Sequence, residues 1–425
     1  MEPVLRERPF PFLLESSLVE GQTGGSTYMG SDPCLVLSAK GSRISLWEAG
    51  KERIWTGDPF EALDSILKEE NLIGIGWLGY ELCRSLETLP SSTKDDLQFP
   101  DLFIAFHDQI QQKSPTHVHW RTIGTEGPAR LRAISPTDYR ELFGNTNRPP
   151  LSQNFSKEDY LKAVGIAKDY IAAGDIYQVN LSQRFETTGP DPWEVYGRLK
   201  QESPAPFSAF LDIGGKSVLS SSPEQFLSVH NTEITTRPIK GTRPRIMNRV
   251  EDQRMGRELY SSRKDDAELA MIVDLERNDL GRLCQAGTIQ VEEAKKLETH
   301  PTVHHLSATI RGTLRESVGS ADILRATFPG GSITGAPKIR AMEIIDELEP
   351  THRGVYTGAI GMLGPGREMN LSIAIRVLHH DKGRYSFQVG GAIVADSDPE
   401  SEYQETLVKA RGMARALGMK WNMSL

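Results

Sequence analysis

Short apolar runs separated by clusters of turn-forming residues dominate the first third of the chain. Residues 34–37 and 73–80 are two such runs, and glycine, serine and aspartate gather around them. Strands joined by turns produce this pattern, so we expect a β-rich structure here. Residues 144–154 combine two prolines with glycine, asparagine and serine, which disfavours a helix. We expect this segment to connect an N-terminal lobe, residues 1–150, with a catalytic region, residues 151–425.

Residues 157–173 have the start, the spacing and the end of an amphipathic helix. Ser156 can cap the first turn, and Asp159 stands at the acid position of a capping-box-like start. Gly174 can end the helix. Apolar residues recur at intervals of three and four along the segment: Leu161, Val164, Ala167 and Ile171.

The next segment, residues 176–185, alternates in the way that a β-strand does. One face is wholly polar and carries Gln178, Asn180, Ser182 and Arg184. A polar strand face is usually exposed to solvent, and the alternative is a face directed into a cleft. The pattern alone leaves both interpretations open.

Strands and helices alternate irregularly through the rest of the chain. We predict β segments at residues 217–230, 233–239, 354–363, 370–378 and 385–394. Helical patterns cover residues 249–284, 321–328, 336–348 and 400–417. A mixture without regular βαβ units indicates an α+β fold.

Composition and charge narrow the range of functions. The formal net charge of −8 repels phosphate backbones, so we expect a small-molecule substrate and no nucleic acid. No apolar run reaches membrane-spanning length, and acids and prolines stand where a signal peptide has its apolar core, so we expect neither a membrane nor export. Cys34, Cys83 and Cys284 match no disulfide framework or metal-binding pair, which predicts reduced thiols and a cytoplasmic location.

Two predicted helices each carry a pair of acids three residues apart. Asp265 and Glu268 form the first pair, and Glu402 and Glu405 form the second. Residues at this spacing share a helix face. If the two faces meet, they form a carboxylate-walled site suited to Mg²⁺, which takes a few carboxylates together with waters and substrate oxygens. The alternative is that the helix dipole simply favours acids near a helix start, as Asp398 followed by proline suggests.

Residues 327–338 place glycines before a lysine and a predicted helix, as a phosphate-binding loop does. The Gly-Lys-Ser/Thr pattern is missing, however, because Ala336 and Pro337 separate Gly335 from Lys338. A helix N-terminus that binds a carboxylate and a purely structural turn both remain open.

Residues 237–245 hold four cations in nine positions. Such a run is usually solvated; alternatively it recognises an anion, or lowers the pKa of Lys240 by like-charge repulsion and desolvation. His300, His304 and His305 lie close together without a nearby cysteine. Adjacent histidines do not easily share one zinc ion, so we expect a hydrogen-bonding role here.

Six sequence segments, taken together and in their order along the chain, resemble the chorismate-utilising enzyme family. The resemblance covers residues 156–425, with weaker family signatures at residues 13–16, 28–33 and 76–80. It implies an α+β fold of two large facing antiparallel β-sheets surrounded by helices, with chorismate bound in a cleft. Its most specific segments are IYQVNLS at 176–182, SSPE at 221–224, PIKGT at 238–242, AELAMIVDLERND at 267–279, GSITGAPK at 331–338 and ADSDPESE at 395–402.

The resemblance also implies which residues bind metal and substrate. Glu268 and Glu405 match the magnesium ligands, with Glu402 and Asp265 at the supporting positions, although some relatives have glutamate in place of Asp265. An arginine and other groups match the positions that grip the two carboxylates of chorismate: Tyr356, Arg376, Gly390, Gly391, Ala392 and Lys409. Residues matching the pocket beside the ring are Gly241, Thr242, His305 and Ser332.

Three positions of the resemblance bear on the reaction. Glu224 matches the general acid that protonates the departing C4 hydroxyl, which requires a carboxyl kept protonated by burial. Members that add water have a lysine base where this chain has Gln178, and an amide cannot serve as that base. Anthranilate-forming members have alanine where this chain has Lys240. A lysine there resembles the branch that forms 4-amino-4-deoxychorismate, in which its amine attacks C2 before ammonia adds at C4.

We therefore expect amination of chorismate at C4, with ammonia from a separate glutaminase subunit, because no amidotransferase cysteine–histidine pair is visible. The alternatives are anthranilate synthesis and a chorismate-binding homologue without activity; the intact acids and lysine speak against the latter. Leu14, Glu15 and Ser16 resemble part of a tryptophan pocket. They equally match the start of an apolar strand, so both interpretations stay open.

Overall fold

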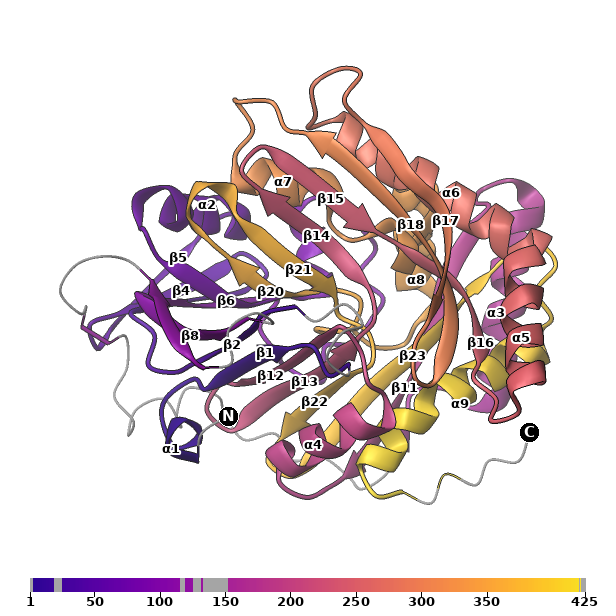
Figure 1. The fold of residues 1–425 in the computed structure, drawn as a ribbon, viewed down its shortest axis with the longest axis horizontal. Helices are drawn as coiled ribbons and strands as arrows, with labels where there is room; N and C mark the ends of the chain where they lie inside the picture. The colour runs from indigo at the N-terminus through magenta and orange to yellow at the C-terminus, as the bar shows by residue number, and fades with distance from the viewer. Residues whose placement is uncertain are drawn as a thin grey trace.

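The computed structural model describes residues 3–18, 25–114, 119–124, 131–132, 152–419 and 421. Two large antiparallel sheets face each other, and helices surround them (Figure 1). This arrangement confirms the α+β class expected from the sequence. Of the predicted connection at residues 144–154, residues 144–151 lie outside the described residues.

Sheet 1 has eleven strands in the part of the chain that the structure describes, and all their pairings are antiparallel. From edge to edge the order is β10 (Ser152–Gln153), β11 (Gln178–Thr188), β23 (Arg384–Ile393), β22 (Val377–Asp381), β13 (Lys216–Ser222), β12 (Phe207–Asp212), β1 (Phe12–Glu15), β2 (Thr27–Gly30), β8 (Gln109–Lys113) and β9 (Arg121–Gly124). The short strand β19 (Gly335–Ala336) pairs with β11 beside this path.

Sheet 2 has twelve strands within the same described ranges, again antiparallel. The order is β16 (Ile239–Pro244), β18 (Val303–Thr313), β15 (Glu233–Arg237), β14 (Gln225–His230), β21 (Met369–Ile373), β20 (Ala359–Leu363), β6 (Ile73–Leu78), β7 (Leu102–His107), β3 (Leu35–Lys40), β4 (Arg43–Glu48) and β5 (Lys51–Thr56). The long strand β17 (Gln290–Thr299) pairs with β18.

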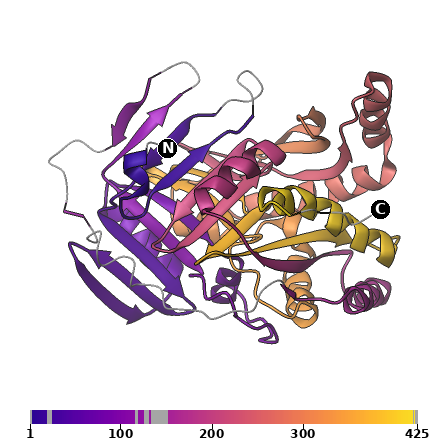
Figure 2. The same ribbon diagram turned by 90° about the horizontal axis from the view of Figure 1, so that it is seen from below.

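The helices lie outside the two sheets. Their bounds are α1 (Pro3–Arg6), α2 (Pro59–Glu69), α3 (Lys157–Ala173), α4 (Pro192–Glu202), α5 (Arg249–Ser261), α6 (Arg263–Gly281), α7 (Ser320–Thr327), α8 (Lys338–Leu348) and α9 (Pro399–Ala416), with short 3₁₀ turns η1 (Tyr80–Ser85), η3 (Gly331–Ile333) and η4 (Pro365–Arg367). Seen from below, α4 and α9 lie side by side across sheet 1 (Figure 2). Within the described ranges, every helix is too short or too polar to cross a membrane.

In each sheet, a block of strands from the first part of the chain joins a block of strands from the later part. In sheet 1, β1 pairs with β12, with Leu13 opposite Phe210. In sheet 2, β6 pairs with β20, with Trp77 opposite Ile360. The predicted N-terminal lobe and catalytic region therefore share both of their sheets.

Apolar side chains fill the space between the two sheets where strands from the first part of the chain lie. Trp77 of β6 stacks on Phe103 of β7, with ring centroids 4.8 Å apart. Leu211 and Val377 of sheet 1 belong to the same buried cluster. Two sheets with one apolar face each are stabilised by burying these faces against each other.

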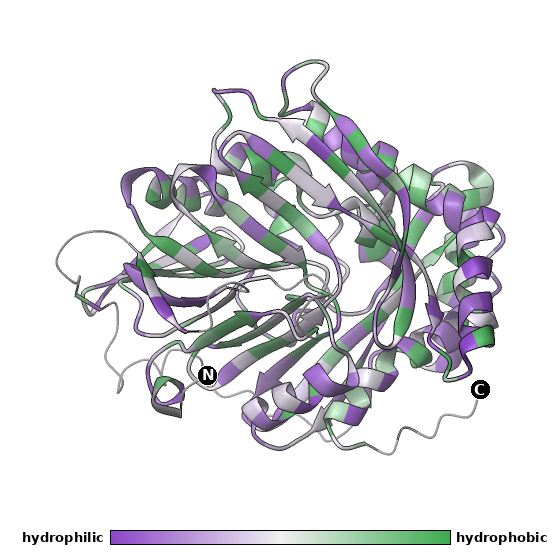
Figure 3. Ribbon diagram, viewed as in Figure 1, coloured by the Kyte–Doolittle hydropathy of each residue, from purple (hydrophilic) through white to green (hydrophobic). Residues whose placement is uncertain are grey.

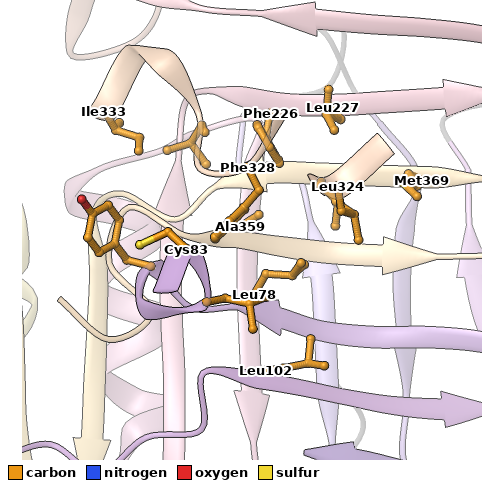
Figure 4. Packing of buried hydrophobic residues seen from close by; sticks show 14 of the residues in the cluster. Leu78, Cys83, Leu102, Phe226, Leu227, Leu324, Phe328, Ile333, Ala359 and Met369 are labelled. Atoms are coloured by element: carbon orange, nitrogen blue, oxygen red, sulfur yellow. The ribbon is translucent and has the colours of Figure 1, made fainter. Parts of the chain in front are cut away.

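A second, larger cluster packs the outer faces of the sheets against the helices. Figure 4 shows one part of it, where Phe226 packs against Phe328 and Met369 lies farther along the strands of sheet 2. The strands carry much of the hydrophobic colour, whereas α5 is mostly hydrophilic (Figure 3). The helices therefore shield the sheets from water.

The helix predicted at residues 157–173 is confirmed with both of its ends. Ser156 accepts a hydrogen bond from the amide of Asp159, and Gly174 is left-handed with φ of +84°. The helical pattern at residues 249–284 is interrupted, because Ser262 ends α5 and caps α6 through the amide of Asp265. These ends form because a side-chain oxygen satisfies an amide that lacks a partner inside the helix.

The polar face of β11 is buried, so its interpretation as a solvated face was wrong. Gln178, Asn180, Ser182 and Arg184 are all buried. Ser182 donates from both its amide and its hydroxyl to Glu349, which follows α8. The chain before and after α8 contacts this face, and these polar partners, distant in sequence, lower the free-energy cost of burying it.

Candidate active site

Lys240 lies on β16 with its side chain directed into the protein, and it is 9% exposed. Its Nζ donates a hydrogen bond to the carbonyl oxygen of Ser332 in η3, 2.8 Å away. Burial lowers the pKa of the Lys240 amine, against the opposite effect of the carboxylates of Glu268 and Glu224. A lysine held in this way loses its proton more readily and can act as a nucleophile.

The three arginines that flank Lys240 each pair with an acid: Arg237 with Glu298, Arg243 with Asp265 and Arg245 with Asp252. Each guanidinium charge is therefore compensated by a carboxylate. The largest cause of the lowered pKa of Lys240 is burial rather than repulsion from these arginines. The cation-rich segment thus serves mainly to hold β16 against its neighbours.

Glu224 lies in the turn between β13 and β14 and is 4% exposed. Burial raises the pKa of its carboxyl above the ordinary value, although the Ser332 hydroxyl and the charge of Lys240 oppose the shift. The amide of Ile239 donates to Glu224 Oε1 over 3.3 Å. The structure therefore brings a buried acid and a buried amine together, as the resemblance implied.

Gly241, Thr242 and His305 form one wall beside these two groups. Thr242 Oγ1 and His305 Nδ1 lie 2.9 Å apart. Burial lowers the pKa of His305 to about 3, and the nearby charge of Arg376 adds to this, so the ring is neutral. Gly241 has φ of +70°, and a Cβ there would lie 2.8 Å from Asp265 Oδ1. Only glycine fits between this strand and the acid.

The residues expected to grip carboxylates come from β23 of sheet 1, from α9 and from the segments before β20 and β22. A Cβ on Gly390 would lie 3.1 Å from the Tyr356 hydroxyl, and Lys409 Nζ donates to the Gly390 carbonyl over 2.9 Å. Arg376 has a left-handed backbone, and burial lowers its pKa to about 10. Ala392 lies opposite Asn180 on β11. Arg376 therefore remains a cation that can accept an anionic ligand.

The four acids expected at the metal site lie on α6 and α9. Burial raises the pKa of Glu268, and the carboxylates of Asp265 and Glu405 raise it further. Lys409 lowers the pKa of Glu405, to which its Nζ lies 2.7 Å away. Burial raises the pKa of Glu402. These mutual effects place the acidic faces of the two helices within electrostatic range of each other.

The space at Gly391 tests whether these residues fit a divalent cation. A Cβ on Gly391 would lie 3.1 Å from Glu402 Oε2 and 3.8 Å from Glu405 Oε1, so the two carboxylates converge beside Gly391, and a larger residue there would crowd Glu402. No three His, Cys, Asp or Glu of the described residues form a metal-holding group. Magnesium binds through one or two carboxylates completed by water and substrate oxygens, so the donor set fits it.

His304 of β18 has a hydrogen-bonding role, as expected for one of this group of histidines. Its Nε2 lies 3.1 Å from Asp252 Oδ1, and its Nδ1 lies 3.0 Å from the Thr299 hydroxyl. His300, before β18, lies 3.4 Å from Glu298 Oε2 through its Nε2. Partners on α5 and β17 therefore hold the His304 ring in place.

Leu14, Glu15 and Ser16 lie at the end of β1 in sheet 1. Glu15 Oε1 accepts hydrogen bonds from the Tyr196 hydroxyl at 2.9 Å and from Lys200 Nζ at 2.5 Å. Ser16 Oγ accepts from the amide of Leu18. The segment is therefore tied to α4, and the tryptophan pocket stays a prediction.

A buried ion pair beneath the site was missed by the sequence analysis. Arg353 forms two hydrogen bonds to Glu349, of 2.6 and 2.9 Å, and both residues are almost wholly buried. Its Nη2 also donates to the Asn180 carbonyl, and its guanidinium lies over the Tyr356 ring. The pair braces β11 and Tyr356 from behind. The i,i+4 spacing was visible, but its burial depends on strands distant in sequence.

Comparison with known proteins agrees with this geometry. A sequence profile described as "chorismate binding enzyme" matches residues 14–415. The chain belongs to the chorismate-binding enzyme family. The match spans both sheets of this chorismate-binding enzyme and every residue assigned above to its candidate site.

Individual relatives divide between two activities. The chorismate-binding enzyme is 38% identical to aminodeoxychorismate synthase component 1 of Escherichia coli, over 97% of this chain and 94% of that protein. It is 36% identical to anthranilate synthase component 1 of Acetivibrio thermocellus, over 96% and 90% respectively. The crystal structure of anthranilate synthase component I from Streptococcus pneumoniae is similar to it with a TM-score of 0.79, at 28% identity and 94% coverage of both chains.

Proposed function

We propose that this chorismate-binding enzyme forms 4-amino-4-deoxychorismate from chorismate and ammonia. The observation that carries the proposal is the Lys240 amine, which is buried, 2.8 Å from the Ser332 carbonyl and within electrostatic range of Glu224. The similarity to aminodeoxychorismate synthase component 1 supports it. Anthranilate synthesis is the second candidate, because relatives with that name have a similar identity.

In the proposed reaction, Lys240 and Glu224 act on opposite ends of the conjugated ring diene. The neutral Lys240 amine forms a bond to C2 of the ring while both ring double bonds shift and the C4–oxygen bond breaks. Glu224 gives its proton to the departing hydroxyl, which leaves as water. Ammonia then forms a bond to C4 as an ammonium group, both double bonds return, and the C2–nitrogen bond to Lys240 breaks. The nitrogen thus replaces the C4 hydroxyl, and the lysine is regenerated.

The remaining residues position the substrate for these steps. Arg376 and Tyr356 would grip one carboxylate, and Lys409 with the Gly390–Ala392 backbone the other, because charged and backbone donors hold carboxylates in a fixed orientation. His305, Thr242 and Ser332 would line the ring. A bound Mg²⁺ would neutralise the ring carboxylate. Glu268 and Glu405 would hold the ion, with Glu402 and Asp265 in support.

A partner subunit completes the proposal. The term "component 1" in the relatives' names implies a second component, and we propose that it is a glutaminase that supplies ammonia. The product would be a precursor of p-aminobenzoate for folate synthesis. The described cysteines Cys34, Cys83 and Cys284 are buried free thiols, which fits the cytoplasm.

Product identity is the test. The purified chain would be incubated with chorismate, magnesium and ammonium salt, and the products would be separated by chromatography. Accumulation of 4-amino-4-deoxychorismate supports the proposal. Anthranilate as the main product would favour the second candidate, and recovery of unchanged chorismate would indicate a binding protein without activity.

A further inference from the structure

A second buried carboxyl lies behind the general acid. Glu276 of α6 is 8% exposed, and its Oε2 accepts a hydrogen bond of 2.6 Å from the Thr236 hydroxyl of β15. Asp279, one turn further along α6, pairs with Lys338 at the start of α8. The reaction proposed above uses none of these groups.

Glu276 borders a small cavity next to the chain segment that carries Ser332. The cavity measures about 210 Å³ with the part open to solvent included. Its lining combines apolar residues with four polar ones, Thr236, Glu276, Asp279 and Thr327. Gly331, which also lines it, directly precedes Ser332, whose hydroxyl lies beside Glu224. The polar groups of the lining supply the two to four partners that a water molecule needs.

The electrostatic surroundings favour a protonated Glu276 at neutral pH. Burial raises the pKa of its carboxyl to about 8, while the hydrogen bond from Thr236 opposes this. Negative charge on Glu224 raises the pKa of Glu276 further, and so does Asp279, whereas Lys338 lowers it. A neutral carboxyl is both a proton donor and an acceptor.

We propose that Glu276 is a positioning residue that returns a proton to Glu224 after each turnover. The inference rests on the proposed function, in which Glu224 loses its proton to the C4 hydroxyl. The Glu276 carboxyl then gives up its proton, which passes through the Thr236 hydroxyl or cavity water to the Glu224 carboxylate. Water entering the cavity from solvent reprotonates Glu276. One proton enters from solvent for each proton that Glu224 delivers.

The geometry supports a relay more than a structural role alone. A single hydrogen bond to Thr236 could be accepted equally by a glutamine, which would cost nothing to keep neutral. A carboxyl at the same place carries a desolvation penalty whenever it ionises. A chain that instead has glutamate beside a solvent-connected cavity gains a group able to exchange protons.

The test compares Glu276→Gln with Glu276→Ala, using the full-length enzyme with chorismate, magnesium and ammonium. Glu276→Gln keeps the shape and the hydrogen bond but cannot pass on a proton. We expect kcat to fall by roughly tenfold near pH 8.5 and by less than about twofold near pH 6.5, with KM unchanged, because solvent acids become scarce at high pH. In Glu276→Ala, added acetate should restore part of kcat by occupying the space of the lost carboxyl.

Asp274→Asn is the matched control, since Asp274 lies on the same helix and its side chain is exposed beside Arg277. It should leave the pH profile of kcat unchanged. A Glu276→Gln profile that superimposes on that of the wild type, together with no acetate rescue, would overturn the inference. Product identity is read in the same assays, so failure of the proposed function would appear separately, as anthranilate or unreacted chorismate from the wild-type enzyme.

Discussion

The Nζ of Lys240 donates a hydrogen bond to the carbonyl oxygen of Ser332, 2.8 Å away. This bond joins an edge strand of sheet 2 to the turn before α8, and it holds the buried amine within electrostatic range of Glu224. Without this bond, the flexible lysine side chain would adopt many rotamers and its amine would have no fixed position. The position of this one amine has direct consequences for the product.

The first prediction concerns a covalent adduct on Lys240. Incubation with chorismate and magnesium but without ammonia should build up an adduct on the peptide that contains Lys240, because ammonia is needed to release the amine. Mass spectrometry after quenching would detect it. Lys240→Ala should abolish the adduct and shift residual amination towards the ortho product, since the C2 side of the pocket is then open.

Lys162→Ala, at an exposed position of α3, serves as the control and should form the adduct normally. Wild-type enzyme that forms no adduct and produces mainly anthranilate would contradict the assignment of Lys240.

The second prediction concerns magnesium. Glu268→Gln or Glu405→Gln should raise the magnesium concentration needed for half-maximal turnover by at least about tenfold and abolish activity at low magnesium, because each removes a hard anionic ligand. Circular dichroism should show an intact fold. Glu400→Gln changes an exposed acid of α9, the helix that carries Glu405, and should behave like the wild type. Full activity of either ligand variant at low magnesium would rule out the assigned site.

The third prediction concerns the nitrogen source. The isolated chain should use ammonium salts, with higher rates at higher pH, where more of the ammonia is unprotonated and nucleophilic. Glutamine should support synthesis only after a glutaminase subunit is added. Product formation from glutamine by the pure chain would show that the ammonia-releasing activity resides here instead.

The fourth prediction concerns the buried pair Glu349–Arg353. Arg353→Met should lower the free energy of unfolding by about 3–5 kcal/mol, because it leaves the Glu349 carboxylate buried without its cation. The double variant Glu349→Leu/Arg353→Met should recover much of that loss. Urea denaturation would measure both effects, provided that the slope m of unfolding free energy against urea concentration is the same for all variants. If the double variant were as unstable as the single one, the unpaired charge would not be the cause.

The fifth prediction concerns stability as a function of pH. The folded-state pKa of Glu276 is about 8, above its ordinary value, so the folded state holds this proton more tightly than the unfolded state does. Its contribution to stability is complete below the unfolded pKa and is lost as pH rises through about 8.

Glu276→Gln should remove this pH-dependent loss of unfolding free energy, which amounts to at most about 1.4 kcal/mol for each pH unit. Urea midpoints at several pH values between acid and mildly alkaline conditions would show a flatter dependence than in the wild type. Equal slopes for the two proteins would mean that Glu276 titrates near its ordinary pKa.

Features that depend on neighbours along the chain followed from the sequence alone. The ends of α3 at Ser156 and Gly174 could be predicted because a cap needs only a side-chain oxygen or a left-handed glycine within a few residues. The mixed α+β class followed from the irregular order of periodic segments. Resemblance at short motifs identified Glu224 and Lys240 as candidates, and the structure buries both within electrostatic range of each other.

Features that depend on partners distant in sequence were decided only by the tertiary structure. The polar face of β11 is buried because Glu349 and Arg353, more than 150 residues away, satisfy groups of Asn180 and Ser182. Glu276 is a weak acid because strands of sheet 2 exclude water from one turn of α6. Periodicity reports which residues share a face. Whether water or protein lies against that face is a property of the folded chain, and burial sets both the cost of a polar group and its pKa.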